Sequence, residues 1–406
     1  MFNENWIGLA GFAILLGLAF QQNGLLAIAI LVLVAAAAGR VWNQYCLTDV
    51  DFSRSFSERR AFLGETVEID LQVTNRKLLP VAWLKIDDEY PLPVTILDGK
   101  VQPSTKPDVG LLSNLVSLRW FERARWRYRV RCDHRGFYAF GPTHFQAGDL
   151  FGLFQSRASS PAQDWLIVYP AVKPIRMLRF PSKDPFGDIK ARQRIFEDPS
   201  RPVGIRDHRA EDPLKRIHWK ATARRQRLQV KVYEPTTAYQ LVVFLNMVTL
   251  PRHWQGTIPE LLERVVSVAA SIANYAMEKR IQVGLLANGC WPQSDQPLKV
   301  LPSRSPDQLT RILEALAAVS ALPTISIEDL LNRESARLPW GATLVVVTAL
   351  VSEELLLVVD RLQSAGRRVV LVRLDDQPLP FEVHHLSVHH VVDAGQAFDL
   401  EPESGI

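Results

Sequence analysis

Residues 239–287 contain, in order, the segments YQLVVFLN (Tyr239–Asn246), ELLERVVSVAASIANYAMEK (Glu260–Lys279) and IQVGLLA (Ile281–Ala287). The first and third segments are short apolar runs, which are typical of strands buried on both faces of a sheet. In the middle segment apolar residues recur every three to four positions, which predicts a helix with one face on that sheet. The order strand, helix, strand indicates a parallel sheet covered by helices.

The same alternation continues toward the C-terminus. The pattern predicts a helix over 307–319, a strand over 343–349, a helix through 357–362 and a strand over 368–374. We therefore expect a doubly wound, mostly parallel α/β domain over 235–400.

Upstream of this domain the hydrophobic pattern has a period of two. TVEIDLQVTN (Thr66–Asn75) and RWRYRVRC (Arg125–Cys132) alternate apolar and polar residues, as half-buried antiparallel strands do. We expect an all-β, β-sandwich-like domain over 47–172, followed by a linker over 173–203 that is rich in Pro, Lys, Arg and Asp. Four arginines of the second segment share one face, which indicates a solvated sheet face; a surface for nucleic acid or lipid headgroups is the alternative.

Two apolar runs without charge occupy the N-terminus, WIGLAGFAILLGLAF (Trp6–Phe20) and GLLAIAILVLVAAAAG (Gly24–Gly39). Each is short for a bilayer span, so we expect a transmembrane helical hairpin over 1–46 that borrows flanking residues. A signal peptide is one alternative, but its basic first region is missing; a buried soluble hairpin is the other. Basic residues begin at Arg40 and the connecting turn has none, so both termini and the soluble domains are expected in the cytoplasm, on the cell membrane.

Composition sets few further limits. Hydrophobic residues make up 47% and charged residues 22%, which is ordinary for globular domains, and the net charge of +4 does not by itself imply a polyanionic partner. Three cysteines lie far apart, and no Asn-X-Ser/Thr acceptor occurs. A disulfide framework is therefore not expected, and a reducing compartment fits better.

The stretch GIRDHRAEDPLKRIHWKATARRQRLQVKVYE (Gly204–Glu234) is dense in charged and aromatic residues. Asp212, followed by proline, can begin a helix, because a carboxylate caps free backbone amides. Ile217, Ala221 and Arg224 then recur at helical spacing, and a strand-like run follows.

We expect this segment to act as a structural clasp, in which arginines pair with neighbouring acids while Ile217 and Trp219 anchor in apolar surface. Recognition of a protein partner is one alternative. Binding of nucleic acid through the basic patch Arg201–Lys231 is another, since such a patch attracts phosphates.

The segment resembles the signature of the bacterial domain-of-unknown-function family fifty-eight. The resemblance is carried by Arg206, His208, Glu211, Asp212, Arg216, Ile217, Trp219, Ala221, Ala223, Arg224, Leu228 and Lys231. It implies a membrane hairpin, a β-rich domain, the signature over 204–234, a von Willebrand A-like α/β domain, and association with a MoxR-type AAA+ ATPase. The expected signature and interaction residues are Arg206, Asp212, Arg216, Ile217, His218, Trp219, Lys220, Arg224 and Lys231.

In von Willebrand A-like domains an Asp-X-Ser-X-Ser motif after the first strand, with further Thr and Asp oxygens, holds a divalent cation. This chain has Asn246, Val248 and Leu250 at the motif positions, and Ala349 follows Thr348 at the end of a later strand. We therefore expect no metal at this site and no cofactor.

Other catalytic patterns are weak. The sequence has no Gly-rich phosphate loop, nucleophile elbow, paired CxxC or HExxH. A hydrolytic enzyme centred on His218 and Asp212 is one alternative, and a zinc site at the histidines of 384–390 is another. The expected function is a membrane-anchored, non-enzymatic scaffold that binds a MoxR-type ATPase, the lipid bilayer and a protein client, without nucleic acid.

Overall fold

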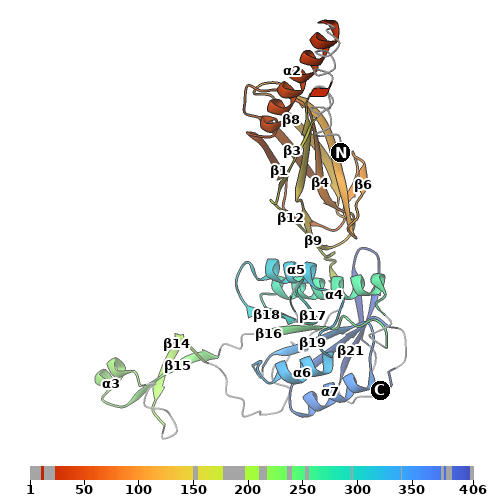
Figure 1. Cartoon of the computed structure of the whole chain (residues 1–406). Coiled ribbons are helices and arrows are strands. Elements are labelled where there is room, and N and C mark those ends of the chain that lie inside the picture. The colour runs from red at the N-terminus through yellow and green to blue at the C-terminus, as the bar shows by residue number, and fades with distance from the viewer. Residues whose placement is uncertain are drawn as a thin grey trace. The chain divides into compact units, whose positions relative to one another are not determined.

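The computed structural model describes residues 11–12, 23–149, 154–176, 197–209, 217–235, 240–251, 256–292, 294, 296–339, 341–375, 379–380 and 386–402. The chain divides into two units, Met1–Ala171 and Val172–Ile406 (Figure 1).

The first unit is built from antiparallel strands, with one parallel pair formed by β2 and β12. Its strands are β1 (Val50–Phe56), β2 (Arg60–Phe62), β3 (Thr66–Asn75), β4 (Val81–Pro91), β5 (Thr95–Ile96), β6 (Val101–Pro103), β7 (Val109–Leu118), β8 (Arg123–Arg131), β9 (Gly136–Phe140), β10 (Thr143–Gly148), β11 (Gln155–Ser160) and β12 (Asp164–Tyr169). They form sheets of order β1-β3-β8-β5, β11-β10-β4-β7-β6 and β2-β12-β9. Alternate residues of β3, among them Ile69, Leu71 and Val73, enter the core between the sheets.

Arg54 lies in the interior of this unit, where its guanidinium is almost fully buried. It forms an ion pair with Asp88, donates to a carboxylate oxygen of Asp164 at 3.0 Å, and donates to the carbonyl oxygen of Phe140 at 2.8 Å. Thr143 also donates to the Asp88 carboxylate, at 2.6 Å. Burial nevertheless raises the pKa of Asp88 above its ordinary value, with Arg54 opposing the shift.

The arginines of β8 share one exposed face, as the period of two predicts. Arg125 and Arg127 pair with Asp70, Arg129 pairs with Asp98, and Arg131 pairs with Asp133. The Arg125 hydrogen bond holds the pKa of the Asp70 carboxyl below its usual range. This face is therefore a ladder of solvated ion pairs, and the expectation of a solvated sheet face is confirmed.

Helix α2 (Asn23–Tyr45) precedes the sheets, and one side of its last turns packs against them. A Cβ added at Gly39 would lie 3.2 Å from a carboxylate oxygen of Asp149, and the Ser156 hydroxyl donates to the carbonyl oxygen of Asn43 at 2.9 Å. The helix also exposes apolar side chains, at Ile28, Ile30, Leu31, Leu33, Val34 and Val41. Among the described residues, no helix is both long and apolar enough to cross a membrane. Most of the first run of the expected hairpin lies outside those residues.

The second unit contains a mixed sheet of order β13-β22-β21-β20-β19-β16-β17-β18. Its strands are β13 (Ile175–Arg176), β16 (Gln240–Leu245), β17 (Gln282–Cys290), β18 (Pro297–Ser303), β19 (Thr343–Thr348), β20 (Arg368–Arg373), β21 (Ser387–Asp393) and β22 (Phe398–Pro402). Strands β17, β16, β19, β20 and β21 are parallel to one another. Strand β18 is antiparallel to β17, β22 is antiparallel to β21, and β13 is parallel to β22.

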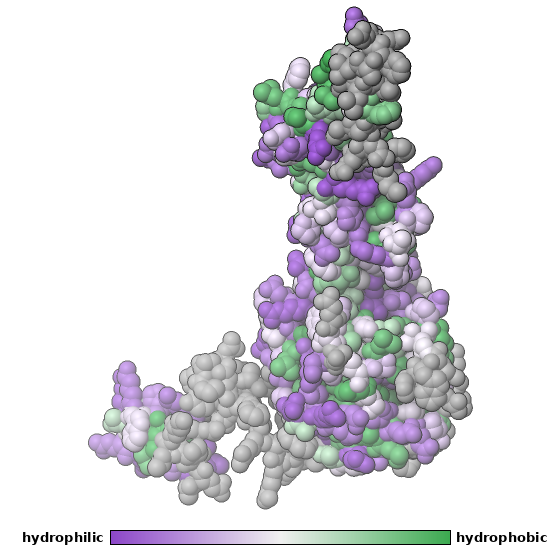
Figure 2. Space-filling model, viewed as in Figure 1, coloured by the Kyte–Doolittle hydropathy of each residue, from purple (hydrophilic) through white to green (hydrophobic). Residues whose placement is uncertain are grey.

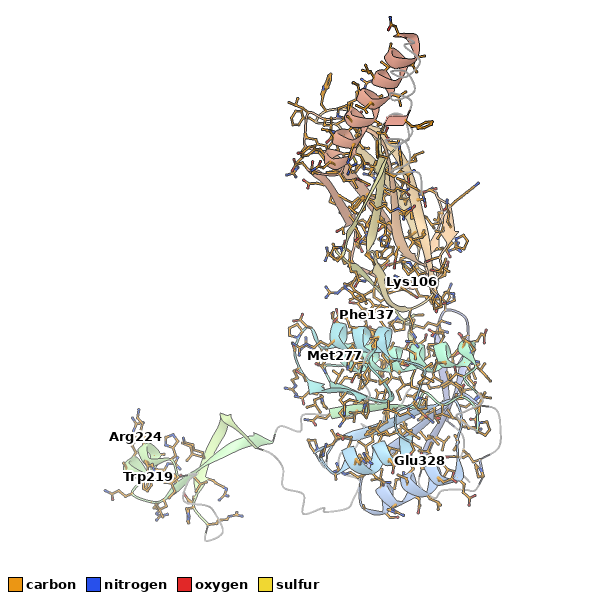
Figure 3. All side chains as sticks on the ribbon, in the orientation of Figure 1. Lys106, Phe137, Trp219, Arg224, Met277 and Glu328 are labelled. Atoms are coloured by element: carbon orange, nitrogen blue, oxygen red, sulfur yellow. The ribbon has the colours of Figure 1, made fainter. Side chains whose placement is uncertain are left out.

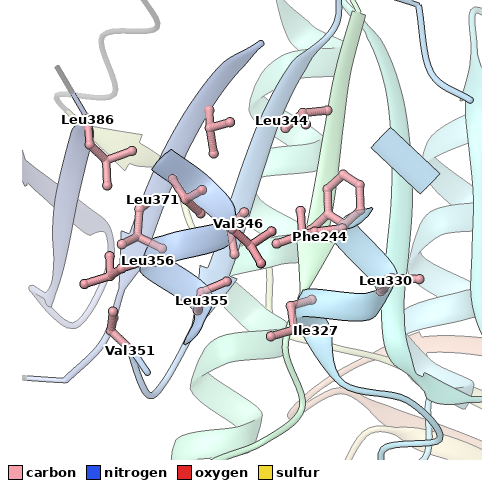
Figure 4. Packing of buried hydrophobic residues seen from close by; sticks show 14 of the residues in the cluster. Phe244, Ile327, Leu330, Leu344, Val346, Val351, Leu355, Leu356, Leu371 and Leu386 are labelled. Atoms are coloured by element: carbon pink, nitrogen blue, oxygen red, sulfur yellow. The ribbon is translucent and has the colours of Figure 1, made fainter. Parts of the chain in front are cut away.

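Helices cover both faces of this sheet, α4 (Pro259–Glu278) and α5 (Gln308–Ala318) on one and α6 (Ile327–Ser335) and α7 (Glu353–Ser364) on the other (Figure 1). Leu355 and Leu356 of α7 and Ile327 of α6 pack on Phe244 and Val346 of the central strands (Figure 4). Their burial between helix and sheet is the main stabilising contribution on this face.

Candidate functional site

The signature segment forms an antiparallel two-stranded ribbon of β14 (Glu197–Asp207) and β15 (Gln229–Pro235), with the short helix α3 (Trp219–Arg225) between them in the chain (Figure 1). Ile205 pairs with Lys231 and Asp207 pairs with Gln229. Of the expected site residues, Asp212 and Arg216 lie outside the described residues, as does Glu211.

Gln229 joins the ribbon to α3, and sequence reasoning missed it. Its side chain and backbone are buried. The backbone N–H donates to the Thr222 hydroxyl at 3.0 Å, the backbone carbonyl accepts from the His218 N–H at 2.8 Å, and the side-chain amide donates to the Asp207 carboxylate. One buried glutamine therefore fixes three parts of the segment.

His218 is the N-cap of α3, because its Nδ1 accepts the backbone N–H of Ala221 at 3.1 Å. Ile217 forms a β-bridge with Val230, and both side chains are buried. The expectation that Ile217 shares a helix face with Ala221 is wrong, because this bridge holds Ile217 in extended backbone before the helix begins. The Nδ1 lone pair of His218 is engaged in the cap.

The helix presents exposed side chains at Trp219, Lys220 and Arg224 (Figure 3). Trp219 is 69% exposed, whereas Ile217 is buried within the segment. Among the described residues none forms an ion pair with Arg224, and Arg206 donates to the carbonyl oxygen of Asp207 at 3.1 Å. Lys231 is half-buried on β15. In the described part of the segment, α3 and the ribbon are joined by hydrogen bonds of His218, Thr222 and Gln229, one of which goes to the Asp207 carboxylate.

A second candidate lies at the carboxyl edge of the α/β sheet, where ligands bind in such sheets. Asn246 follows β16, Asn288 lies near the end of β17, and Thr348 ends β19. The Asn246 amide donates to the Thr348 hydroxyl oxygen at 3.0 Å, and the Asn288 amide donates to Asn246 Oδ1 at 2.9 Å. All three side chains are buried, and sequence reasoning missed Asn288.

The oxygens of this network already accept hydrogen bonds from backbone N–H groups. Asn246 Oδ1 accepts from Val248 at 3.1 Å, Asn288 Oδ1 accepts from Met247 at 2.8 Å, and Thr348 Oγ1 accepts from Leu350 at 3.2 Å. A hard divalent cation prefers charged oxygens with free lone pairs. Within the described part of the chain, no group of three or more His, Cys, Asp or Glu side chains is placed to hold a metal ion.

The C-terminal histidines are divided between two environments. His389 is buried on β21, and burial lowers its pKa, which favours the neutral imidazole; His390 on the same strand is half-buried. The other two histidines of the zinc alternative, His384 and His385, lie outside the described residues.

Residues 204–394 match the family described as "Protein of unknown function DUF58". This part of the chain is therefore similar to the DUF58 family. Helix α3, strand β15 and the Asn246 network lie within the matched range, which begins inside β14.

Similarity to a curated relative extends further along the chain. The uncharacterized protein YeaD of Bacillus subtilis (strain 168) is 24% identical over 331 residues, which cover 77% of this chain and 73% of YeaD. Among solved structures, the CARDB domain of a Pyrococcus furiosus protein matches 30% of the chain and 90% of its own length, with 13% identity and a TM-score of 0.20. A cohesin module from Clostridium perfringens matches 30% of the chain and 97% of its own length, with 12% identity and a TM-score of 0.22. At these TM-scores neither likeness bears on the fold or the function.

Proposed function

We propose that this protein is a membrane-attached, non-enzymatic adaptor that uses α3 to bind a protein partner. The observation that carries the proposal is the exposure of Trp219 beside Lys220 and Arg224, on a helix whose own backbone is fixed by His218 and Gln229. Trp and Arg side chains contribute most to protein interfaces, and a pre-ordered surface loses little entropy on binding. The cationic surroundings favour an acidic partner surface.

The partner that the family resemblance implies is a MoxR-type AAA+ ATPase. The α/β unit would serve as a von Willebrand A-like domain in which the neutral Asn246 and Thr348 stand where such domains hold a cation. Without a cation, such a domain would bind its partner through its own side chains alone.

Membrane attachment is the other part of the proposal. It is supported by the uncharged runs 6–20 and 24–39 and by the exposed apolar side chains of α2. Alkaline carbonate extraction of membranes tests it: the chain should stay in the pellet, and its release into the supernatant would contradict attachment through these runs.

Binding is tested with the full chain in detergent and a purified MoxR-type ATPase from the same cell, by calorimetry or surface plasmon resonance. Trp219→Ala should weaken binding by at least about tenfold, which corresponds to 1.4 kcal/mol. Trp165→Ala, at a tryptophan of β12 that is 46% exposed, is the matched control and should bind as wild type. Equal affinities for both variants would contradict the assignment of α3, and no binding by the wild-type chain would contradict this partner.

A further inference from the structure

Two turns at one end of the first unit carry exposed apolar side chains. Leu78 lies in the turn between β3 and β4 and is 74% exposed, while Trp120 and Phe121 lie in the turn between β7 and β8 and are 66% and 62% exposed. Exposed apolar groups that gather at one place are characteristic of interaction sites.

The two turns are held side by side by backbone and amide hydrogen bonds. The Phe121 N–H donates to the carbonyl oxygen of Lys77 at 3.3 Å. The Asn75 side-chain amide, which is fully buried, donates to the carbonyl oxygens of Leu79 at 3.0 Å and of Arg119 at 2.9 Å. Their exposed side chains therefore form one fixed patch, the turn patch, made of Leu78, Trp120 and Phe121.

Phe121 has a left-handed backbone, with a φ of 52°. This conformation costs a non-glycine residue about 1–2 kcal/mol, and Asn or Gly usually occupies it. The Phe121 side chain is therefore exposed to water, and its backbone conformation is one that Asn or Gly would adopt at lower cost. Such strain, seen together with exposed apolar surface, points to a function for the side chain.

The turn patch lies next to the end of α2. Lys77 donates through its ammonium group to the carbonyl oxygens of Thr48 and Cys46, the latter at 2.9 Å, and the Arg76 N–H donates to the carbonyl oxygen of Asp49 at 2.9 Å. These contacts join the segment after α2 to the same turn. An open apolar groove of about 560 Å³ lies beside this turn. It is lined by Leu79 and by α2 residues that include Val41, Trp42 and Tyr45. Figure 2 shows hydrophobic surface, in green, around α2.

Exposed arginines flank the turn patch at Arg76, Arg119 and Arg123. Two carboxylates lie among them, since Arg76 pairs with Asp51 at 2.5 Å and Glu122 accepts the Arg119 backbone N–H at 2.6 Å. A cation near an anionic bilayer contributes about 1 kcal/mol to membrane binding, and tryptophan is enriched where headgroups meet acyl chains. Apolar tips, an aromatic pair and arginines, all continuous with an apolar helix, match the chemistry of a membrane interface.

We propose that the turn patch enters the headgroup region of an anionic lipid bilayer beside α2, and so sets the orientation of the β unit on the membrane. The inference rests on the membrane attachment proposed above. It adds a second contact with lipid, made by the turns of the sheet and separate from the N-terminal runs.

The test places an environment-sensitive thiol label in the full chain, reconstituted in vesicles of phosphatidylcholine and phosphatidylglycerol. Labels go to Leu78→Cys and Phe121→Cys, with Cys290→Ser as background, since Cys46 and Cys132 are buried. The control is Leu92→Cys, which is 51% exposed and follows the far end of β4. Eleven residues of β4, at about 3.4 Å each, separate it from the turn patch.

Labels at 78 and 121 should be quenched several-fold more by lipids with a spin label near the headgroup than by iodide, and the label at 92 should show the reverse. If the chain stays on the vesicles while all three labels are equally open to iodide, the turn patch is not a lipid contact, although membrane attachment stands. If the chain does not associate with the vesicles at all, both proposals are overturned. Thermal melting of each labelled chain should match wild type, because all three positions are exposed.

Discussion

The side-chain amide of Asn246 donates to the hydroxyl oxygen of Thr348 at 3.0 Å, across the neighbouring parallel strands β16 and β19. The Thr348 hydroxyl in turn donates to the carbonyl oxygen of Leu350 at 2.6 Å, which directs its proton away from Asn246. Polar groups at this edge of the sheet thus satisfy one another without a charged ligand.

Removal of the Asn246 amide should therefore lower the stability of the fold without changing how the melting temperature responds to Mg²⁺. Asn246→Ala leaves the Asn288 amide and the Thr348 hydroxyl each short of a buried partner, which should lower the free energy of unfolding by about 1–3 kcal/mol. The wild-type chain should show no Mg²⁺-dependent change in melting temperature. The control is Asn274→Ala, whose amide bonds to Glu278 on the surface of α4. Saturable Mg²⁺ binding by calorimetry, lost in Asn246→Ala, would contradict this expectation.

The buried pair of Arg54 and Asp88 predicts a pH-dependent defect. Arg54→Leu removes the charge and the hydrogen bonds that oppose the raised pKa of Asp88, so this pKa rises further. A carboxyl group with a folded-state pKa above its unfolded value contributes stability at low pH and loses it as the pH rises through the folded pKa. Arg54→Leu should thus cost about 3–5 kcal/mol at pH 7.5, and less at pH 5.

Melting temperatures at both pH values measure this effect. Arg59→Leu is the control, because the Arg59 side chain is 69% exposed and lies 3.4 Å from the Asp164 carboxylate. The double variant Arg54→Leu/Asp88→Leu should lose less stability than Arg54→Leu alone, since no unpaired buried charge remains. An equal deficit of Arg54→Leu at pH 5 and pH 7.5 would show that packing, and not the charge of Asp88, sets the cost.

The periodic elements of the α/β unit were predictable from sequence. The helix expected over 260–279 is α4 (Pro259–Glu278), and the strand expected over 343–349 is β19 (Thr343–Thr348). Long runs of one period are specified locally by the residues they bury. The short helix α6 (Ile327–Ser335) and the antiparallel strands β18 and β22 were missed, because few residues carry their pattern.

The candidate sites were less predictable, because their contacts are distant in sequence. Asn288 and Asn246 are 42 positions apart, and Gln229 and Asp207 are 22 apart, so neither pairing leaves a local pattern. The capping role of His218 was also missed, since Ser, Thr, Asn and Asp are the usual caps and Asp212 matched that preference. Exposure of Trp219 could not be read from its hydrophobicity alone.

The side of the membrane on which the termini lie is a further prediction, which the described residues do not test. Basic residues follow the second apolar run and the turn between the runs has none, so both termini should be cytoplasmic. A reporter that is active only in the periplasm, fused after Ile406, should be inactive, and a cytoplasmic reporter at the same place should be active. The opposite result would place the two soluble units outside the cytoplasm.

The signature segment should separate folding from recognition at two residues that only His218 divides. Ile217 is buried against Val230, and Ile→Ala at buried sites typically costs about 2–5 kcal/mol, whereas Trp219 is 69% exposed. Ile217→Ala should therefore speed hydrogen exchange at the amides of Ala221 and Gln229 by at least about tenfold, since 1.4 kcal/mol is a factor of ten. Trp219→Ala and Arg224→Ala should leave that exchange unchanged and weaken partner binding. If Trp219→Ala instead speeds this exchange as Ile217→Ala does, Trp219 supports the fold of the segment, as the clasp hypothesis expects.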